Sequence, residues 1–142
     1  MALLSFEYYI SKGLVKRRRK NRALAKSLLK SAIDRMKFSK SILKCKPRYA
    51  LEMAYEAVIE LIDALLALKG YKSWSHEANI AFLRKLGFAE TEIKRLDLSR
   101  RRRHSSKYYG VFFSKEEARE EVNELEKAFK KLLREVRKEI AK

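Results

Sequence analysis

The chain of 142 residues has little of what interrupts regular structure or builds compact metal sites. It contains one cysteine, one proline, four glycines and two histidines. The single Cys45 excludes an intramolecular disulfide bond, and together with two histidines it disfavours a dedicated zinc site. We therefore expect no metal and no other cofactor. The scarcity of proline and glycine predicts that the chain is built from long elements.

Long hydrophobic runs are also missing. No apolar stretch approaches the length of a bilayer span, and residues 1–10 lack the basic flank that precedes the apolar core of a signal peptide. The basic segments lack the Trp- and Phe-rich opposite face of an interfacial helix. These absences predict a cytoplasmic protein without a membrane partner. Abundant Lys, Arg and Glu, with three Asn and no Gln, are typical of a thermophile.

Positive charge is present in excess and is unevenly spread. The formal net charge is +17, and residues 1–50 carry 15 of the 35 basic residues but only two of the 18 acidic ones. A basic half of this kind favours a polyanionic partner, most often a nucleic acid. The alternative is a charged surface that only keeps the protein soluble. We favour the nucleic acid.

Apolar residues recur at steps of three and four, which is the period of an amphipathic helix. We expect one domain over residues 1–142, in which residues 1–22 form a short helix and a basic arm and residues 23–142 form the bundle. No segment alternates with period two, so we expect no strand. The fold class is all-α, an up-and-down helical bundle of four or five principal helices. The expected helices cover about 3–11, 24–36, 47–69, 75–86 and 90–103, and a last one follows the capping-box pattern at 114–117.

The strongest candidate site lies at the end of the helix expected from residue 90. Arginine matches the geometry of a phosphate, and histidine can move a proton near neutral pH. Helical steps from Ile93 and Leu96 lead into this cluster, so its polar groups continue a stripe that faces either inward or an interface. The alternative is an ion-paired helix end whose basic residues complement the helix dipole. The candidate phosphate-binding residues are Arg100, Arg102, Arg103, Lys107, Tyr108 and Tyr109, and His104 is the candidate catalytic residue.

A second basic cluster precedes the helix that begins near Leu24. Such a block is typical of an arm that contacts phosphates, because it releases condensed counterions from a polyanion. Tyr8 and Tyr9 lie close upstream, where they either stack on bases or belong to the core. We expect His76 to be a capping or surface residue, since it lacks the spaced partner of a zinc protease motif. The candidate RNA-binding residues of this cluster are Lys16, Arg17, Arg18, Arg19 and Lys20.

The order of these segments resembles the HEPN domain (higher eukaryotes and prokaryotes nucleotide-binding) over most of the chain. The resemblance implies a helical bundle that commonly forms a homodimer and acts in RNA metabolism or as a toxin component. It also implies that active members are metal-independent ribonucleases with an Arg, four to six intervening residues and a His at the dimer cleft. Other members are partners of minimal nucleotidyltransferases. The resemblance rests on residues 10–16, 32–36, 49–58, 64–70, 75–77, 109–110 and 114–118.

The catalytic pattern of that family is not intact in this sequence. His104 would need an arginine at position 97, 98 or 99, and Arg103 is followed after four residues by Tyr108. A tyrosine of ordinary pKa is a poor general base at neutral pH. We therefore expect binding of RNA or nucleotide phosphates, as in a toxin–antitoxin component, with Arg102 and Arg103 clamping phosphate. A ribonuclease that uses His104, and a non-catalytic partner of a nucleotidyltransferase, remain the alternatives, so enzyme activity is left open.

Overall fold

The computed structural model describes residues 3–109 and 113–142, except for the side chains of residues 104–109. The expectation of an all-α helical bundle is confirmed. In chain order the elements are α1 (Phe6–Ser11), β1 (Val15–Arg17), α2 (Arg22–Ile42), α3 (Pro47–Lys69), β2 (Tyr71–Ser73), α4 (His76–Phe82), the short 3-10 helix η1 (Leu83–Leu86), α5 (Glu90–Tyr109) and α6 (Lys115–Ala141).

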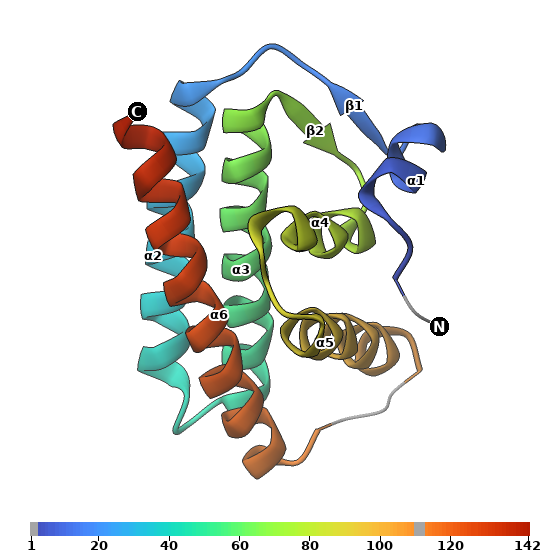
Figure 1. Ribbon diagram of the computed structural model, residues 1–142. Helices are drawn as coiled ribbons and strands as arrows, with labels where there is room; N and C mark the ends of the chain where they lie inside the picture. The colour runs from blue at the N-terminus through green and yellow to red at the C-terminus, as the bar shows by residue number, and fades with distance from the viewer. Residues whose placement is uncertain (1–2, 110–112) are drawn as a thin grey trace.

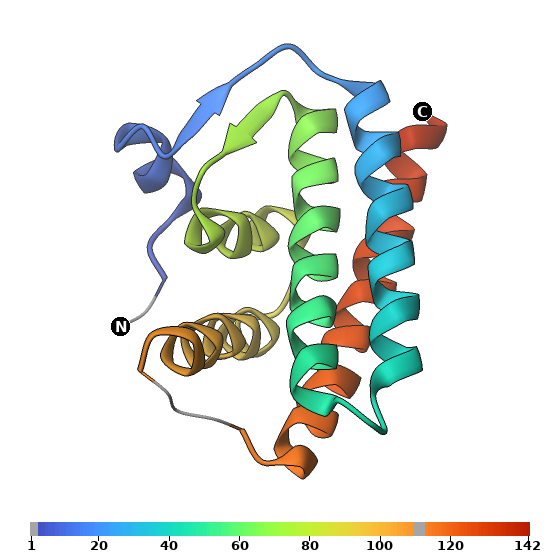
Figure 2. The ribbon, with the colours of Figure 1, turned by 180° about the vertical axis from the view of Figure 1, so that it is seen from behind.

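Three long helices, α2, α3 and α6, form the body of the bundle, and α4 and α5 lie across it (Figure 1). Helix α3 packs against both α2 and α6. It runs antiparallel to α2 and in the same direction as α6, as Figures 1 and 2 show. Helices α4 and α5 lie across α3 on the side away from α2, and the two strands lie near the end of α3.

Helix α3 is the centre of the core, as its wide apolar face predicts. Its alanines are small enough for neighbouring helices to approach closely, and most of its large apolar residues are buried as well. Pro47 occupies the first turn, and Gly70 ends the helix in a left-handed conformation, as expected. Fully buried positions of α3 include Ala50, Ala54, Ala57, Leu61, Ile62, Ala64 and Leu65.

The other helix ends also follow local sequence signals. The predicted capping box is present at the start of α6, where the Ser114 side chain accepts from the Glu117 backbone and the Glu117 side chain accepts from the Ser114 backbone. Ser75 caps the start of α4, because its side chain accepts a hydrogen bond from the Ala78 backbone N–H. The expected helix over 75–86 is divided into α4 and η1, and the expected helix over 3–11 begins at Phe6.

The expectation of no strand is wrong. β1 and β2 form a two-stranded antiparallel sheet in which Val15 pairs with Ser73, Lys16 with Lys72 and Arg17 with Tyr71. The first residues of the expected basic arm therefore belong to a strand. Strands of three residues are too short to show alternation, and their stability comes from a partner far away in the chain.

The sheet is fixed closely against the end of α3. The Arg18 backbone N–H donates to the Gly70 carbonyl at 2.8 Å, and the Asn21 N–H donates to the Ala67 carbonyl at 3.0 Å. Gly70 has φ +86°, and a Cβ atom there would lie 2.9 Å from the Arg18 carbonyl oxygen. Only glycine satisfies both the dihedral angle and this close approach.

We expect Gly70→Ala to lower the free energy of unfolding by about 2–4 kcal/mol, because strain in the backbone adds to the clash with Arg18. Gly13→Ala is the matched control, since Gly13 has φ +75° and no atom within 4 Å of the added Cβ. That control should lose only about 1 kcal/mol. Urea unfolding of the three proteins measures the difference, and equal losses would contradict the close approach at Gly70.

Candidate functional site

Two arginines of the cluster on α5 share one buried carboxylate. Arg100 Nε lies 2.9 Å from Asp97 Oδ1, and Arg101 Nη2 lies 2.7 Å from Asp97 Oδ2. Arg100 also reaches α4, where its Nη1 lies 3.7 Å from Glu77 Oε1. Asp97 is only 4% exposed, so its charge is satisfied by these arginines rather than by water.

Arg102 links α5 to α6. Its Nη2 lies 3.2 Å from Glu117 Oε2, and its Nη1 lies 3.4 Å from Glu121 Oε1. The guanidinium carbon also lies 4.7 Å from the centroid of the Phe113 ring, within the range of a cation–π contact. Ser99 donates to the second oxygen of Glu121 at 2.6 Å, so this carboxylate is held from two sides.

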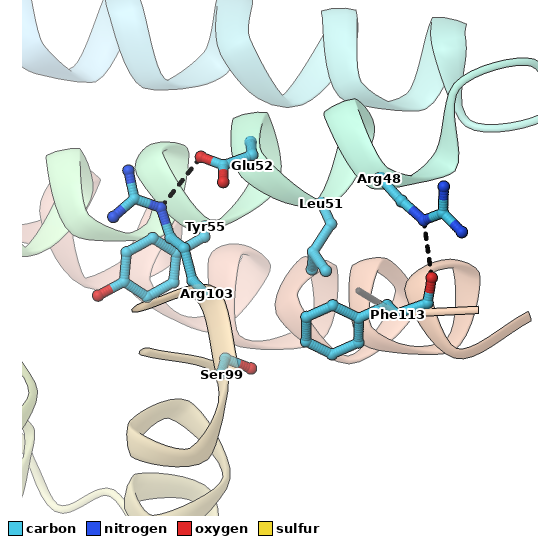
Figure 3. Close-up of a pocket in the computed structure, with 7 residues that line it drawn as sticks. All are labelled: Arg48, Leu51, Glu52, Tyr55, Ser99, Arg103 and Phe113. Atoms are coloured by element: carbon cyan, nitrogen blue, oxygen red, sulfur yellow. Dashed lines mark hydrogen bonds and ion pairs between the residues drawn. The ribbon is translucent and has the colours of Figure 1, made fainter. Parts of the chain in front are cut away.

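Arg103 links α5 to α3 (Figure 3). Its Nε lies 3.1 Å from Glu52 Oε2 and its Nη2 lies 2.7 Å from Glu56 Oε1. The guanidinium carbon lies 5.2 Å from the centroid of the Tyr55 ring. The adjoining pocket has a volume of about 30 Å³, enough for about one water molecule. It is lined by Arg48, Leu51, Glu52, Tyr55, Ser99, Arg103 and Phe113.

The arginine cluster, residues 100–103, therefore connects helices through ion pairs. Its four arginines contact six carboxylates, which come from α3, α4, α5 and α6. This geometry favours the alternative of an ion-paired cluster. Phosphate binding by Arg100, Arg102 and Arg103 stays a prediction, and it would require a phosphate to replace carboxylates already in contact. The side chains of His104, Lys107, Tyr108 and Tyr109 lie outside the described part of the structure.

The basic tract, residues 16–20, has a different environment. All five side chains are exposed, and among the described residues no carboxylate forms an ion pair with any of them. Arg17 lies over the Tyr71 ring at 5.1 Å, and Arg18 lies over the Trp74 ring at 5.6 Å from the centroid. The tract is thus available to an anion without the loss of an existing ion pair.

The two tyrosines upstream of the tract have separate environments. Tyr9 belongs to the core, with 4% exposure, and its hydroxyl donates to Glu77 Oε2 at 3.3 Å. Tyr8 is 40% exposed, and Lys12 Nζ lies 5.6 Å from the centroid of its ring. Of this pair, only Tyr8 is accessible to a ligand.

Sequence patterns offered no reason to assign a binding role to Lys72 or Trp74, which lie beside the basic tract. Residues 71–74 read Tyr-Lys-Ser-Trp, in which aromatic and polar residues do not alternate. The sequence therefore carried no local signal for a strand here. The nearness of this segment to residues 16–18 depends on the register of the sheet, which pairs residues far apart in the sequence.

His76 was expected at the surface or as a cap, but it is half-buried between helices. Its Nδ1 lies 3.0 Å from the Tyr55 hydroxyl, and Ser75 provides the cap instead. Burial lowers the pKa of His76, Glu56 raises it, and Arg103 and Arg100 lower it further. Burial also raises the pKa of Tyr55 far above its usual value. Both groups are therefore neutral near pH 7.

The described residues contain no helix long and apolar enough to cross a membrane. They also hold no group of three or more His, Cys, Asp or Glu side chains that could bind a metal ion. Compared with models of protein families, with curated proteins and with solved structures, the chain gives no match.

We expect the folded protein to lose stability on mild acidification because of His76. Its folded pKa lies below the unfolded value of 6.5, so the unfolded chain binds a proton more readily. The stabilising contribution of the neutral ring is complete above the unfolded pKa and is lost as the pH falls through the folded pKa. Thermal unfolding between about pH 7.5 and 5.5 should therefore show a falling Tm.

Substitution distinguishes the contributions of the two histidines to the pH dependence of Tm. His76→Gln should reduce this fall in Tm, whereas His104→Gln serves as the comparison that removes the other imidazole. A fall that persists in full in His76→Gln would contradict the assignment to His76.

Proposed function

We propose that the protein binds RNA or nucleotide phosphates, and that the basic tract is its main phosphate-contacting surface. The observation that carries the proposal is the contrast between the two basic clusters. Among the described residues, the tract has five exposed cations without a carboxylate partner, whereas each arginine from 100 to 103 contacts at least one carboxylate.

The contrast matters because binding to a polyanion is an exchange of partners. An unpaired lysine or arginine that meets a phosphate displaces only water and condensed counterions, whose release favours binding. An arginine such as Arg103 must first leave Glu52 and Glu56, and those carboxylates would then repel the incoming phosphate. The tract is therefore the better surface for a first contact with nucleic acid.

The resemblance to HEPN domains supports RNA as the polyanion. In the HEPN-like form of the proposal, a cytoplasmic homodimer would bring two copies of segment 100–109 together. Arg102 and Arg103 would then hold phosphate and Tyr108 would orient it. A ribonuclease that uses His104 and a nucleotidyltransferase partner stay predictions that rest on the resemblance alone.

We expect Arg19→Gln/Lys20→Gln to weaken RNA binding about tenfold at low salt. The slope of log K against log [salt] should become shallower by about 1.4, since each phosphate contact of a single strand contributes about 0.7. The measurement is fluorescence anisotropy of a labelled single-stranded RNA over a series of NaCl concentrations. In the described part of the chain neither side chain forms an ion pair with an acidic residue, so the fold should be preserved.

Lys115→Gln/Lys130→Gln is the matched control, because it removes the same charge from exposed positions on α6. Its salt slope should equal that of the unmodified protein. Equal effects of both double variants would mean that only net charge matters. An unchanged slope in the tract variant, with a shallower slope in Arg103→Gln, would assign phosphate binding to the arginine cluster instead.

A further inference from the structure

Trp74 exposes its indole ring beside three cationic side chains. The residue is 54% exposed. Lys16 Nζ lies 6.0 Å from the ring centroid, Arg18 Cζ lies 5.6 Å from it, and Lys72 Nζ lies 5.9 Å from it. A single exposed aromatic residue is ordinary on a protein surface, whereas this ring lies within about 6 Å of three exposed cations.

The backbone around Trp74 is held by its neighbours. The Trp74 N–H donates to the Leu14 carbonyl at 2.9 Å, which continues the pairing of β1 and β2 by one residue. The Ser75 N–H donates to Ser73 Oγ at 3.1 Å, and Ser75 then caps α4. The ring is thus attached to a segment fixed on both sides, which lowers the entropy lost when a ligand stacks on it.

The sheet also contains an unfavourable pair. Lys16 and Lys72 are directly opposite each other, and like charges in this position destabilise an antiparallel pair. Both are exposed, and no carboxylate among the described residues forms an ion pair with either. Their contacts with the indole ring offset part of this repulsion, and an anion bound between them would offset more.

From these observations we propose that Trp74 stacks on an unpaired base of single-stranded RNA while Lys16, Arg18 and Lys72 hold the flanking phosphates. An aromatic platform within a basic groove is how proteins bind single strands without sequence preference. In a duplex the faces of the bases are covered by their neighbours, so the indole ring would have no partner there. The inference rests on the proposed function and narrows its ligand to the single-stranded form.

The chain contains one tryptophan, so emission excited at wavelengths beyond the absorption of its seven tyrosines reports on this site alone. Titration with an oligouridylate of about ten nucleotides should quench the emission strongly, because a stacked base is in contact with the ring. Duplex RNA of equal length and inorganic polyphosphate should bind through charge with little quenching. Strong quenching by the duplex or by polyphosphate would overturn the stacking assignment.

Substitution of the ring gives an independent readout. Trp74→Ala should weaken single-strand binding by about 5- to 100-fold and leave the salt slope nearly unchanged, whereas Trp74→Phe should retain most of the affinity. Tyr49→Ala is the matched control, since Tyr49 is an aromatic residue with 66% exposure at the start of α3. It should bind as the unmodified protein does. Circular dichroism confirms that each variant is folded.

The two proposals fail in different ways. One outcome is salt-dependent RNA binding that does not quench the tryptophan emission of the unmodified protein and has the same affinity in Trp74→Ala and Trp74→Phe. That outcome would overturn the stacking inference and leave the proposed function in place. An absence of binding to any RNA at low salt would overturn both. Quenching by the single strand together with loss of affinity in Trp74→Ala alone supports both.

Discussion

The burial of α3 is the constraint on which the other elements depend. Its alanines let α2 and α6 approach closely on two sides, and α4 and α5 cover a third. Because the helix is apolar on most of its circumference, it cannot shift along its axis without exposing large apolar side chains. Both of its ends are therefore fixed in space, and Gly70 directs the chain into β2 at a defined point. The packing of α3 therefore also fixes the position of the surface around Trp74, which follows β2.

The basic residues of the chain have two different roles. On α5, residues 100–103 form ion pairs with acidic residues of α5 and of the neighbouring helices. This part of the helix has few apolar residues to bury. The pairs with the exposed carboxylates of Glu52 and Glu117 contribute about 0–1 kcal/mol each. The buried Asp97 depends on two of these arginines for its ion pairs, so the cluster also fixes the orientation of α5. The basic tract has no such pairs among the described residues. Excess positive charge alone could not distinguish these roles; the location of the acidic residues does.

Sequence patterns predicted the helix ends, which depend on interactions between residues close together in the chain. The bounds of α3 follow from Pro47 and Gly70, and the start of α6 follows from Ser114 and Glu117, because these signals act within one helical turn. The sheet could not be predicted, since β1 has its partner more than fifty residues away. The ion pairs of Arg103 with Glu52 and Glu56 could not be predicted for a similar reason. Helical periodicity describes one helix and does not show which helices pack together.

The register of the sheet has a consequence for the order of folding. By joining residues 15–17 to residues 71–73, it closes a loop that contains α2 and α3 in full. Closing so long a loop is entropically costly unless the enclosed helices have already packed. The surface around Trp74 is therefore completed late, and a partly folded chain carries the same positive charge without the same arrangement. A ligand that recognises the arrangement as well as the charge would bind the folded state selectively, and by mass action it would stabilise the whole bundle.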